Sequence, residues 1–270
     1  MRNRVALLGI FAASALALGA AQAHAQAREE GRLLEATQVL DEVRTSRDQF
    51  IPDRLLERAY GIAVLPNVTK AAFVLGGRYG EGVLVVRDKN SRFTNPIFVR
   101  IGGGSFGWQA GVQSTDIVLV FTTRAGIEGI TDGKLTLGAD ASVAAGPIGR
   151  QATAATDASF SAEVYSYSRA RGLFAGVALD GTALTINAKG NASFYKKRGV
   201  TASDIINGTV STDAEGARRF LAAVSSSTSH SATAPATPKG ATTDGGTPPA
   251  PAEGTRTFPM EDPKPGTEPK

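Results

Sequence analysis

The chain of 270 residues contains no cysteine and only two histidines, His24 and His230. Without cysteine there are no disulfides, no thiolate nucleophile and no sulfur ligand for zinc, so a hydrophobic core must hold the folded part together. Triad hydrolases need a histidine as general base, and both histidines lie near the ends of the chain. The composition therefore argues against triad hydrolysis and against zinc catalysis.

Long apolar runs are also scarce. The one such run, residues 5–21, follows Arg2 and Arg4 and leads to Ala23-His24-Ala25. A basic start, a short apolar stretch and a small-x-small motif are typical of a cleaved secretory signal. We expect residues 1–25 to be this signal peptide and the mature protein to be periplasmic or secreted, without a lipobox cysteine for a lipid anchor.

The mature chain has little excess charge. Loss of Arg2 and Arg4 from the 29 basic residues leaves 27 against 25 acidic residues, a net charge of +2. Nucleic-acid-binding domains usually show a dense basic stripe, and the sequence contains none. We therefore expect no nucleic-acid partner.

Large apolar residues are rare in residues 226–270, which hold nine of the thirteen prolines. Such a segment cannot bury enough surface to offset the entropy of ordering. We expect a disordered Pro/Ser/Thr-rich tail, either a passive solubilising segment or one that recruits an envelope protein partner. The folded domain is then expected over residues 26–225.

Periodicity predicts helices at both ends of this domain and strands between them. Leu33, Ala36, Leu40 and Val43 recur at helical spacing. Helices are also expected at residues 53–59 and after the capping residues Thr201 and Thr212. Short β-branched or aromatic segments predict strands at residues 71–76, 82–87, 97–101, 116–121, 162–167 and 173–179. The predicted fold class is α+β, with N-terminal helices packed on a strongly curved, barrel-like antiparallel β-sheet and short closing helices.

The glycine-rich stretch RIGGGSFGW, residues 100–108, fits two catalytic patterns. Gly102, Gly104 and Gly107 match the dinucleotide fingerprint, and Ser105 sits in a nucleophile-elbow pattern. The residues that follow alternate like a strand, so no helix is present to receive a pyrophosphate, and Ser105 has no histidine base. We interpret the glycines as positions where a strand bends or another segment approaches closely.

Carboxylates offer one further catalytic or metal-binding alternative. Asp116, Asp132, Asp140 and Asp157 fall near predicted strand ends, but no calcium-loop motif surrounds them. Acidic residues at turns usually accept hydrogen bonds from backbone amides, which is the favoured interpretation. We expect no cofactor and no metal. A carboxylate-only enzyme such as a glycan hydrolase would need two acidic groups facing one cleft.

Five blocks in order resemble the SYLF domain family. They are Gly61-Ile-Ala-Val-Leu-Pro-Asn-Val68, Gly76-Gly-Arg-Tyr-Gly-Glu-Gly-Val-Leu84, the stretch from Gly102 to Ser114, Gly138-Ala-Asp-Ala-Ser-Val-Ala-Ala-Gly-Pro147, and the stretch from Ser166 to Gly176. The resemblance implies a non-enzymatic lipid-binding domain. Its eukaryotic members bind phosphoinositide membranes, some also bind actin, and its bacterial relatives are commonly secreted. For this chain the resemblance implies affinity for anionic phospholipid or a membrane surface.

Binding at a membrane surface needs cations for phosphate oxygens and aromatic rings at headgroup depth. The densest basic and aromatic cluster starts at Phe194, where the family's closing motif of Asn191 and an aromatic pair is followed by an inserted basic triplet. The resemblance adds cations of the N-terminal region. The predicted lipid-binding residues are Phe194, Tyr195, Lys196, Lys197, Arg198, Trp108, Arg78, Arg28 and Arg32. A rim of further cations that flank turns comprises Arg87, Lys89 and Arg92.

Two functions remain as alternatives at this stage. The first is a lipid-binding module of the cell envelope without catalysis, although residues 194–198 equally fit a solvated helix end and a lone tryptophan such as Trp108 more often belongs to a core. The second is a structural scaffold of the periplasm that recruits a partner through its tail.

Overall fold

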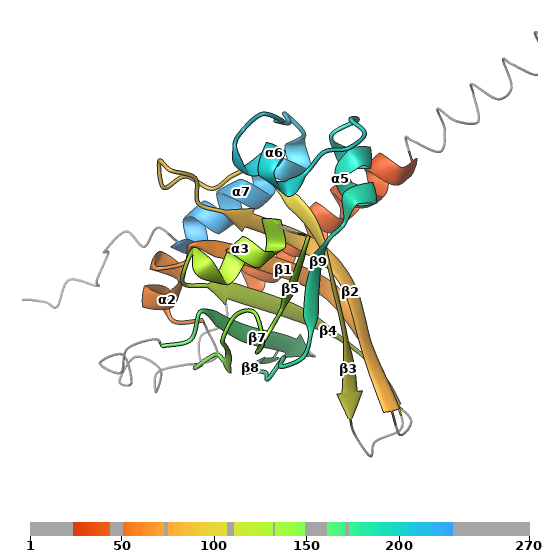
Figure 1. Cartoon of the computed structure of the whole chain (residues 1–270), viewed down its shortest axis with the longest axis vertical. Helices are drawn as coiled ribbons and strands as arrows, with labels where there is room; N and C mark the ends of the chain where they lie inside the picture. Colours follow the sequence, from red (N-terminus) through yellow and green to blue (C-terminus); the bar gives the residue numbers. More distant parts are fainter. Residues whose placement is uncertain are drawn as a thin grey trace, which may run out of the picture. The chain divides into compact units, whose positions relative to one another are not determined.

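The computed structural model describes residues 24–43, 51–72, 75–106, 111–131, 133–148, 161–170 and 173–228 (Figure 1). The predicted signal up to residue 23 and the predicted tail from residue 229 lie outside these residues. The helices are residues 24–43, α2 (Asp53–Glu57), α3 (Ala125–Thr131), α5 (Ala188–Phe194), α6 (Ala202–Ile206) and α7 (Glu215–Thr228). The strands are β1 (Gly61–Ala72), β2 (Leu75–Val86), β3 (Ile97–Phe106), β4 (Gly111–Phe121), β5 (Lys134–Thr136), β6 (Val143–Ala145), β7 (Val164–Ala170), β8 (Leu173–Gly176) and β9 (Ala183–Ile186).

The expected α+β fold class is confirmed, because an N-terminal helix and short helices accompany one strongly curled sheet that forms a half-barrel. Within the described residues, nine strands form this sheet in the order β5-β9-β3-β2-β1-β4-β7-β6, with β8 also paired to β7. The sheet is mixed and not purely antiparallel, since β6 runs parallel to β7. The other described pairs are antiparallel.

Three details of the predicted elements differ from the structure. The strand expected at residues 71–76 falls partly at the end of β1 and partly at the start of β2, with residues 73 and 74 outside the described residues. The capping box expected at Thr212 and Glu215 does not form, since Thr212 accepts from Ala214 N–H and Glu215 pairs with arginines. A capping box forms instead at Thr201 and Asp204, where α6 begins. Helix α7 continues to Thr228, beyond the expected domain end at residue 225.

The curl of the sheet is linked to a bulge in β1. The register between β1 and its neighbours shifts between residues 64 and 69, and Asn67 there has a positive φ of 52°. The Asn67 N–H donates to Asp116 at 2.9 Å and so remains satisfied outside the ladder. A β-bulge bends its strand and increases the twist, which explains why long strands can close a half-barrel.

Both faces of the sheet are buried along most of its length. Alternating residues of each central strand belong to two core clusters, so β1 places Val64 in one cluster and Leu65 in the other. The N-terminal helix, α2 and α7 complete the first cluster, whereas α3 and α6 complete the second. Figure 1 shows β2 and β3 continuing past the helices at the ends that contain residues 75–80 and 102–106.

The glycine run of the sequence lies in a regular part of β3. Gly102, Gly103 and Gly104 pair with β2 without a register shift, so no bulge interrupts the pairing at these positions. The predicted close approach is confirmed at Gly103, where an added Cβ would lie 3.0 Å from Thr182 Cα. No described atom lies within 4 Å of an ideal Cβ at Gly104. Packing against the described residues therefore does not explain why this position is a glycine.

Candidate functional site

The aromatic pair predicted as a lipid anchor lies inside the domain. Phe194 is 3% exposed, and its ring centroid lies 5.0 Å from that of Phe98 and 5.1 Å from that of Tyr195. The Tyr195 hydroxyl donates to the Pro96 carbonyl at 2.7 Å, and burial raises the pKa of this phenol far above its usual range. Both rings therefore help to dock α5 on the start of β3, with Phe194 buried and Tyr195 partly buried.

The third residue of this motif, Asn191, completes the docking. Its side chain is fully buried, accepts from Phe98 N–H at 2.8 Å and donates to Phe98 O at 3.3 Å. The next strand, β9, begins to pair with β3 only at Val99. An amide side chain thus continues the sheet's hydrogen bonding where the neighbouring strand ends. What remains of the family's closing motif is thus a structural joint, which sequence reasoning missed.

The basic triplet at the end of α5 is exposed. Lys196, Lys197 and Arg198 are solvent-exposed and occupy the loop that leads from α5 to α6. The charge of Lys197 acts on Asp204, whose pKa is lowered first by hydrogen bonds from the Thr201 backbone and side chain and last by that charge. Because the Asp204 carboxylate serves the capping box of α6, the triplet presents three cations to solvent or to an anionic partner.

Arg32 is committed to an internal ion-pair network. It pairs with Glu29 on its own helix and with Glu81 on β2, which also accepts from Arg100 Nε at 2.8 Å. Burial alone would raise the pKa of Glu81, but the hydrogen bond from Arg100 and the charge of Arg32 hold it below its usual value. Burial raises the pKa of Glu29 despite Arg32. Arg32 thus fixes the N-terminal helix to the sheet, whereas Arg28 on the same helix is exposed.

A second network holds the other end of the same helix. Arg169 on β7 pairs with Glu42 of the helix and with Asp116 on β4, the latter at 2.7 Å. Asp116, one of the carboxylates considered for a cation site, is therefore an ion-pair partner.

Asp140 accepts from Thr136 N–H at 2.7 Å, as expected of turn chemistry. In the described ranges no three His, Cys, Asp or Glu side chains come together, while Asp132 and Asp157 lie outside those ranges.

The remaining predicted residues lie apart from the triplet. Trp108 falls outside the described residues. Arg78 is half-buried in β2, and burial lowers its pKa. It lies nine residues before Arg87, which is about 30 Å along an extended strand. Arg78 and the cations around Arg87 therefore cannot contact the same headgroup.

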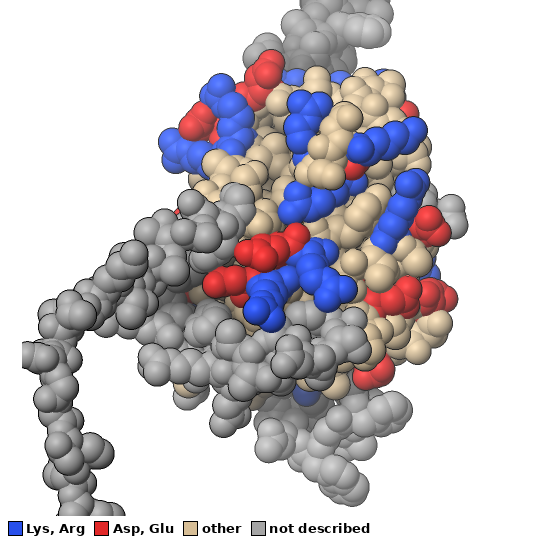
Figure 2. Space-filling model, turned by 90° about the vertical axis from the view of Figure 1, so that its left-hand side faces the viewer, with Lys and Arg blue, Asp and Glu red and all other residues tan. Residues whose placement is uncertain are grey.

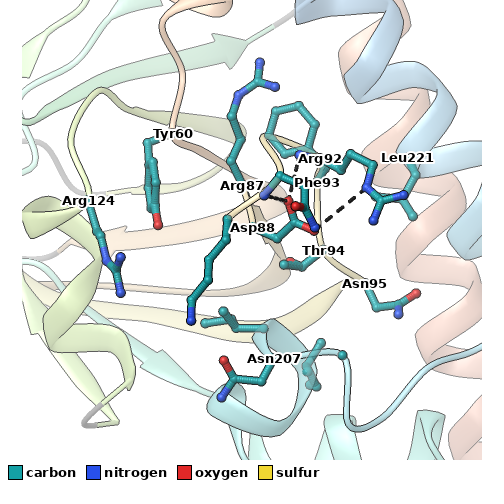
Figure 3. Close-up of a pocket in the computed structure, with 15 residues that line it drawn as sticks. Tyr60, Arg87, Asp88, Arg92, Phe93, Thr94, Asn95, Arg124, Asn207 and Leu221 are labelled. Carbon is teal, nitrogen blue, oxygen red and sulfur yellow. Dashed lines mark hydrogen bonds and ion pairs between the residues drawn. The ribbon is translucent and has the colours of Figure 1, made fainter.

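The rim cations of the sequence do gather, around a cavity of about 770 Å³ beside α6 (Figure 3). We call it the α6 pocket. Its lining comes from the loop that follows β2 (residues 87–95), from the end of α6 and the turn after it (residues 205–208), and from three single residues, Tyr60, Arg124 and Leu221. The lining residues are Tyr60, Arg87, Asp88, Lys89, Asn90, Arg92, Phe93, Thr94, Asn95, Arg124, Ile205, Ile206, Asn207, Gly208 and Leu221.

Two of the four cations in the pocket are held by the pocket's own loop. Arg87 donates to the carbonyls of Ala59 and Ser91, both at 2.8 Å, and its guanidinium lies 4.4 Å from the centre of the Phe93 ring. Burial lowers the pKa of Arg87. Arg92 faces Asp88 at 3.9 Å, a long and exposed ion pair. Arg87 thus shapes the loop, while the two remaining cations are Lys89 and Arg124.

The single acidic group in the lining is turned toward backbone amides. Asp88 Oδ1 accepts from Asn90 N–H at 2.7 Å and from Arg92 N–H at 2.9 Å (Figure 3). The hydrogen bond from the Arg92 backbone is the main reason that the pKa of Asp88 lies below its usual value. Its charge is therefore largely used within the loop, and the α6 pocket has a net positive lining.

Other cations on the surface are often accompanied by acids. In Figure 2, Lys and Arg side chains lie in several groups with acidic side chains beside some of them. On α7, for example, Glu215 pairs with both Arg218 and Arg219. Surface pairs of this kind contribute little to stability, but they reduce the local positive potential. The triplet differs from α7 in that its neighbouring carboxylate, Asp204, is engaged in a capping box, and the α6 pocket differs in that four cations line it beside a single acidic group.

Comparison with known proteins agrees with the resemblance found in the ordered sequence blocks. The family model described as "Ysc84: Las17-binding protein actin regulator" matches residues 102–227. The chain belongs to the Ysc84 family of SYLF-domain proteins. The matched part of the SYLF domain runs from the glycine run in β3 to the last turn of α7.

Relatives of the SYLF domain occur in fungi and animals. "LAS seventeen-binding protein 3" of Saccharomyces cerevisiae is 38% identical over 166 residues, which are 60% of this chain and 36% of that protein. "SH3 domain-containing YSC84-like protein 1" of Mus musculus is 33% identical over 187 residues, 68% of this chain and 54% of that protein. The SYLF domain thus spans about a third to a half of the relatives' own length. The names of these relatives describe binding or domain content, and none of these names describes a reaction.

Proposed function

We propose that this SYLF domain is a non-catalytic module that attaches to anionic phospholipid surfaces. The observation that carries the proposal is the exposed triplet Lys196, Lys197 and Arg198, whose neighbouring carboxylate, Asp204, is engaged in a capping box. The loop of the triplet leads into α6, which is five residues or about 8 Å long and lines the α6 pocket. No helix among the described residues meets the length and apolarity needed to cross a membrane.

The triplet is tested with the variant K196A/K197A/R198A. Each cation near an anionic surface contributes enough that losing three is expected to weaken binding about a hundredfold. The measurement is co-sedimentation of the chain from Gln26 with phosphatidylglycerol-containing vesicles, at low and at high salt. Binding by the wild type is expected to decline with salt, because counterions screen exposed charges.

The matched control is K134A/R218A/R219A, which removes three exposed cations from β5 and α7. This variant is expected to bind nearly as well as the wild type. Equal losses in both triple variants would mean that only net charge matters, and would contradict a role for the triplet. Binding to zwitterionic vesicles at all salt concentrations would contradict the electrostatic mechanism.

A protein partner is the second candidate, favoured by the family description "Las17-binding protein actin regulator". In this chain the tail is the proposed recruiting segment. A chain truncated after Ser229 separates the two functions, since lipid binding by the SYLF domain should survive and recruitment through the tail should not.

We also propose that the mature protein is exported and begins at Gln26. Cleavage after Ala25 would remove two residues of the N-terminal helix and keep its first buried side chain, Glu29. N-terminal sequencing of protein recovered from the periplasm or medium is expected to start at Gln26. An intact Met1 terminus in that protein, or its retention in the cytoplasm, would overturn the proposal.

A further inference from the structure

The α6 pocket combines positive charge with apolar walls. Phe93 and Leu221 are partly buried and pack against the first core cluster, whereas Tyr60 and Ile206 pack against the second. In Figure 3, Tyr60 and Arg124 lie on one side of the pocket and Phe93 and Leu221 on the opposite side. The pocket therefore opens where both cores reach the surface, and it offers contact to apolar as well as charged parts of one ligand.

The two cations available for a ligand are Lys89 and Arg124. Arg87 is held by two carbonyls and an aromatic ring, and Arg92 faces Asp88, a carboxylate that backbone amides fix within the same loop. Lys89 is exposed, and Arg124 faces Glu128 at 3.6 Å with both side chains about two-thirds exposed, at 68% and 66%. Such an exposed pair is weak and readily exchanged for a stronger anion.

We propose that the α6 pocket binds a phosphomonoester. Lys89 and Arg124 contact the phosphate oxygens, and the apolar walls contact the carbon skeleton that carries the phosphate. A phosphomonoester carries between one and two negative charges near neutral pH, which matches the net positive lining of the pocket better than the single charge of a phosphodiester does. The inference rests on the proposed attachment to anionic lipid and adds selectivity to it. Two sources share this chemistry, a lipid headgroup such as phosphatidic acid and a soluble compound such as glycerol 3-phosphate.

The test compares vesicles that contain phosphatidic acid with vesicles that contain phosphatidylglycerol, matched in surface potential. The wild-type chain from Gln26 is expected to bind phosphatidic acid vesicles roughly tenfold more tightly. The variant K89A/R124A is expected to lose this preference and to keep its binding to phosphatidylglycerol. Both side chains are exposed, so the fold should be retained, and R218A/R219A serves as the control with the same change of charge.

Each outcome has a separate meaning. Equal binding of the wild type to the two vesicles, or an unchanged preference in K89A/R124A, would overturn the phosphomonoester seat while leaving membrane attachment intact. If the wild type bound to none of the anionic vesicles, the proposed function itself would be overturned. Competition by glycerol 3-phosphate supports a seat for the phosphomonoester group alone. If the wild type prefers phosphatidic acid vesicles and glycerol 3-phosphate does not compete, the result supports a phosphomonoester carried by a lipid.

Discussion

Replacing Asn191 with alanine is expected to lower the free energy of unfolding by about 3 kcal/mol. The substitution leaves the buried Phe98 N–H without its partner at 2.8 Å and opens a small cavity between α5 and β3. Phe98 O keeps a second donor, Asn187 N–H at 2.9 Å, so the N–H is the group that becomes unsatisfied. Urea denaturation of the chain from Gln26 measures the effect as a lower midpoint with an unchanged slope.

The same helix provides the control. Ser193 has a buried hydroxyl that makes no hydrogen bond in the described structure. Ser193→Ala therefore removes an unsatisfied polar group and is expected to leave stability unchanged or to raise it slightly. If Asn191→Ala and Ser193→Ala had equal effects, the joint between α5 and β3 would not depend on the Asn191 amide.

Replacing Gly82 with alanine is expected to cost about 3 kcal/mol, because the new methyl group would meet backbone that cannot move aside. An ideal Cβ at Gly82 would lie 2.3 Å from Val64 O and 2.7 Å from Leu65 Cα, beside the β1 bulge. The comparison is Gly77→Ala on the same strand, where an ideal Cβ has nothing within 4 Å. That control is expected to be neutral or slightly stabilising, because alanine reduces the entropy of the unfolded chain.

Thermal and urea unfolding of the two glycine variants provide the measurement. A Gly82→Ala protein as stable as the Gly77→Ala protein would show that β1 can shift away from β2. In that case the bulge would not depend on the missing side chain, and the close contact would not be needed for the curl of the sheet.

Much of the fold could be predicted from the sequence because periodicity reports burial. Leu33, Ala36 and Leu40 predicted the buried face of the N-terminal helix, and all three are buried. The three-residue strands β5 and β6 were missed, since a segment of that length has too few residues to show alternation. The β1 bulge was also missed, because Pro66 and Asn67 have the composition of a turn and the strand continues through them.

The candidate site was only partly predictable for a related reason. An aromatic pair beside three cations is compatible with a membrane anchor and with a core joint, and only the register of α5 on β3 distinguishes them. The structure assigns Phe194 and Tyr195 to the joint. Arg87, Lys89 and Arg92 were identified as a rim because they flank a turn, but Arg124 and α6 join them only through tertiary packing.

The strand order also bears on how the chain acquires its structure. The centre of the sheet consists of β3, β2, β1 and β4, which lie within residues 61–121, whereas its flanks come from β7 and β9 after residue 160. A nascent or truncated chain that ends before β7 would carry four long strands with both outer edges unpaired. Unpaired edges are templates for aggregation. A protein with this strand order is therefore expected to be most prone to self-association until β7 and β9 have been synthesised, during translation and during any passage across a membrane.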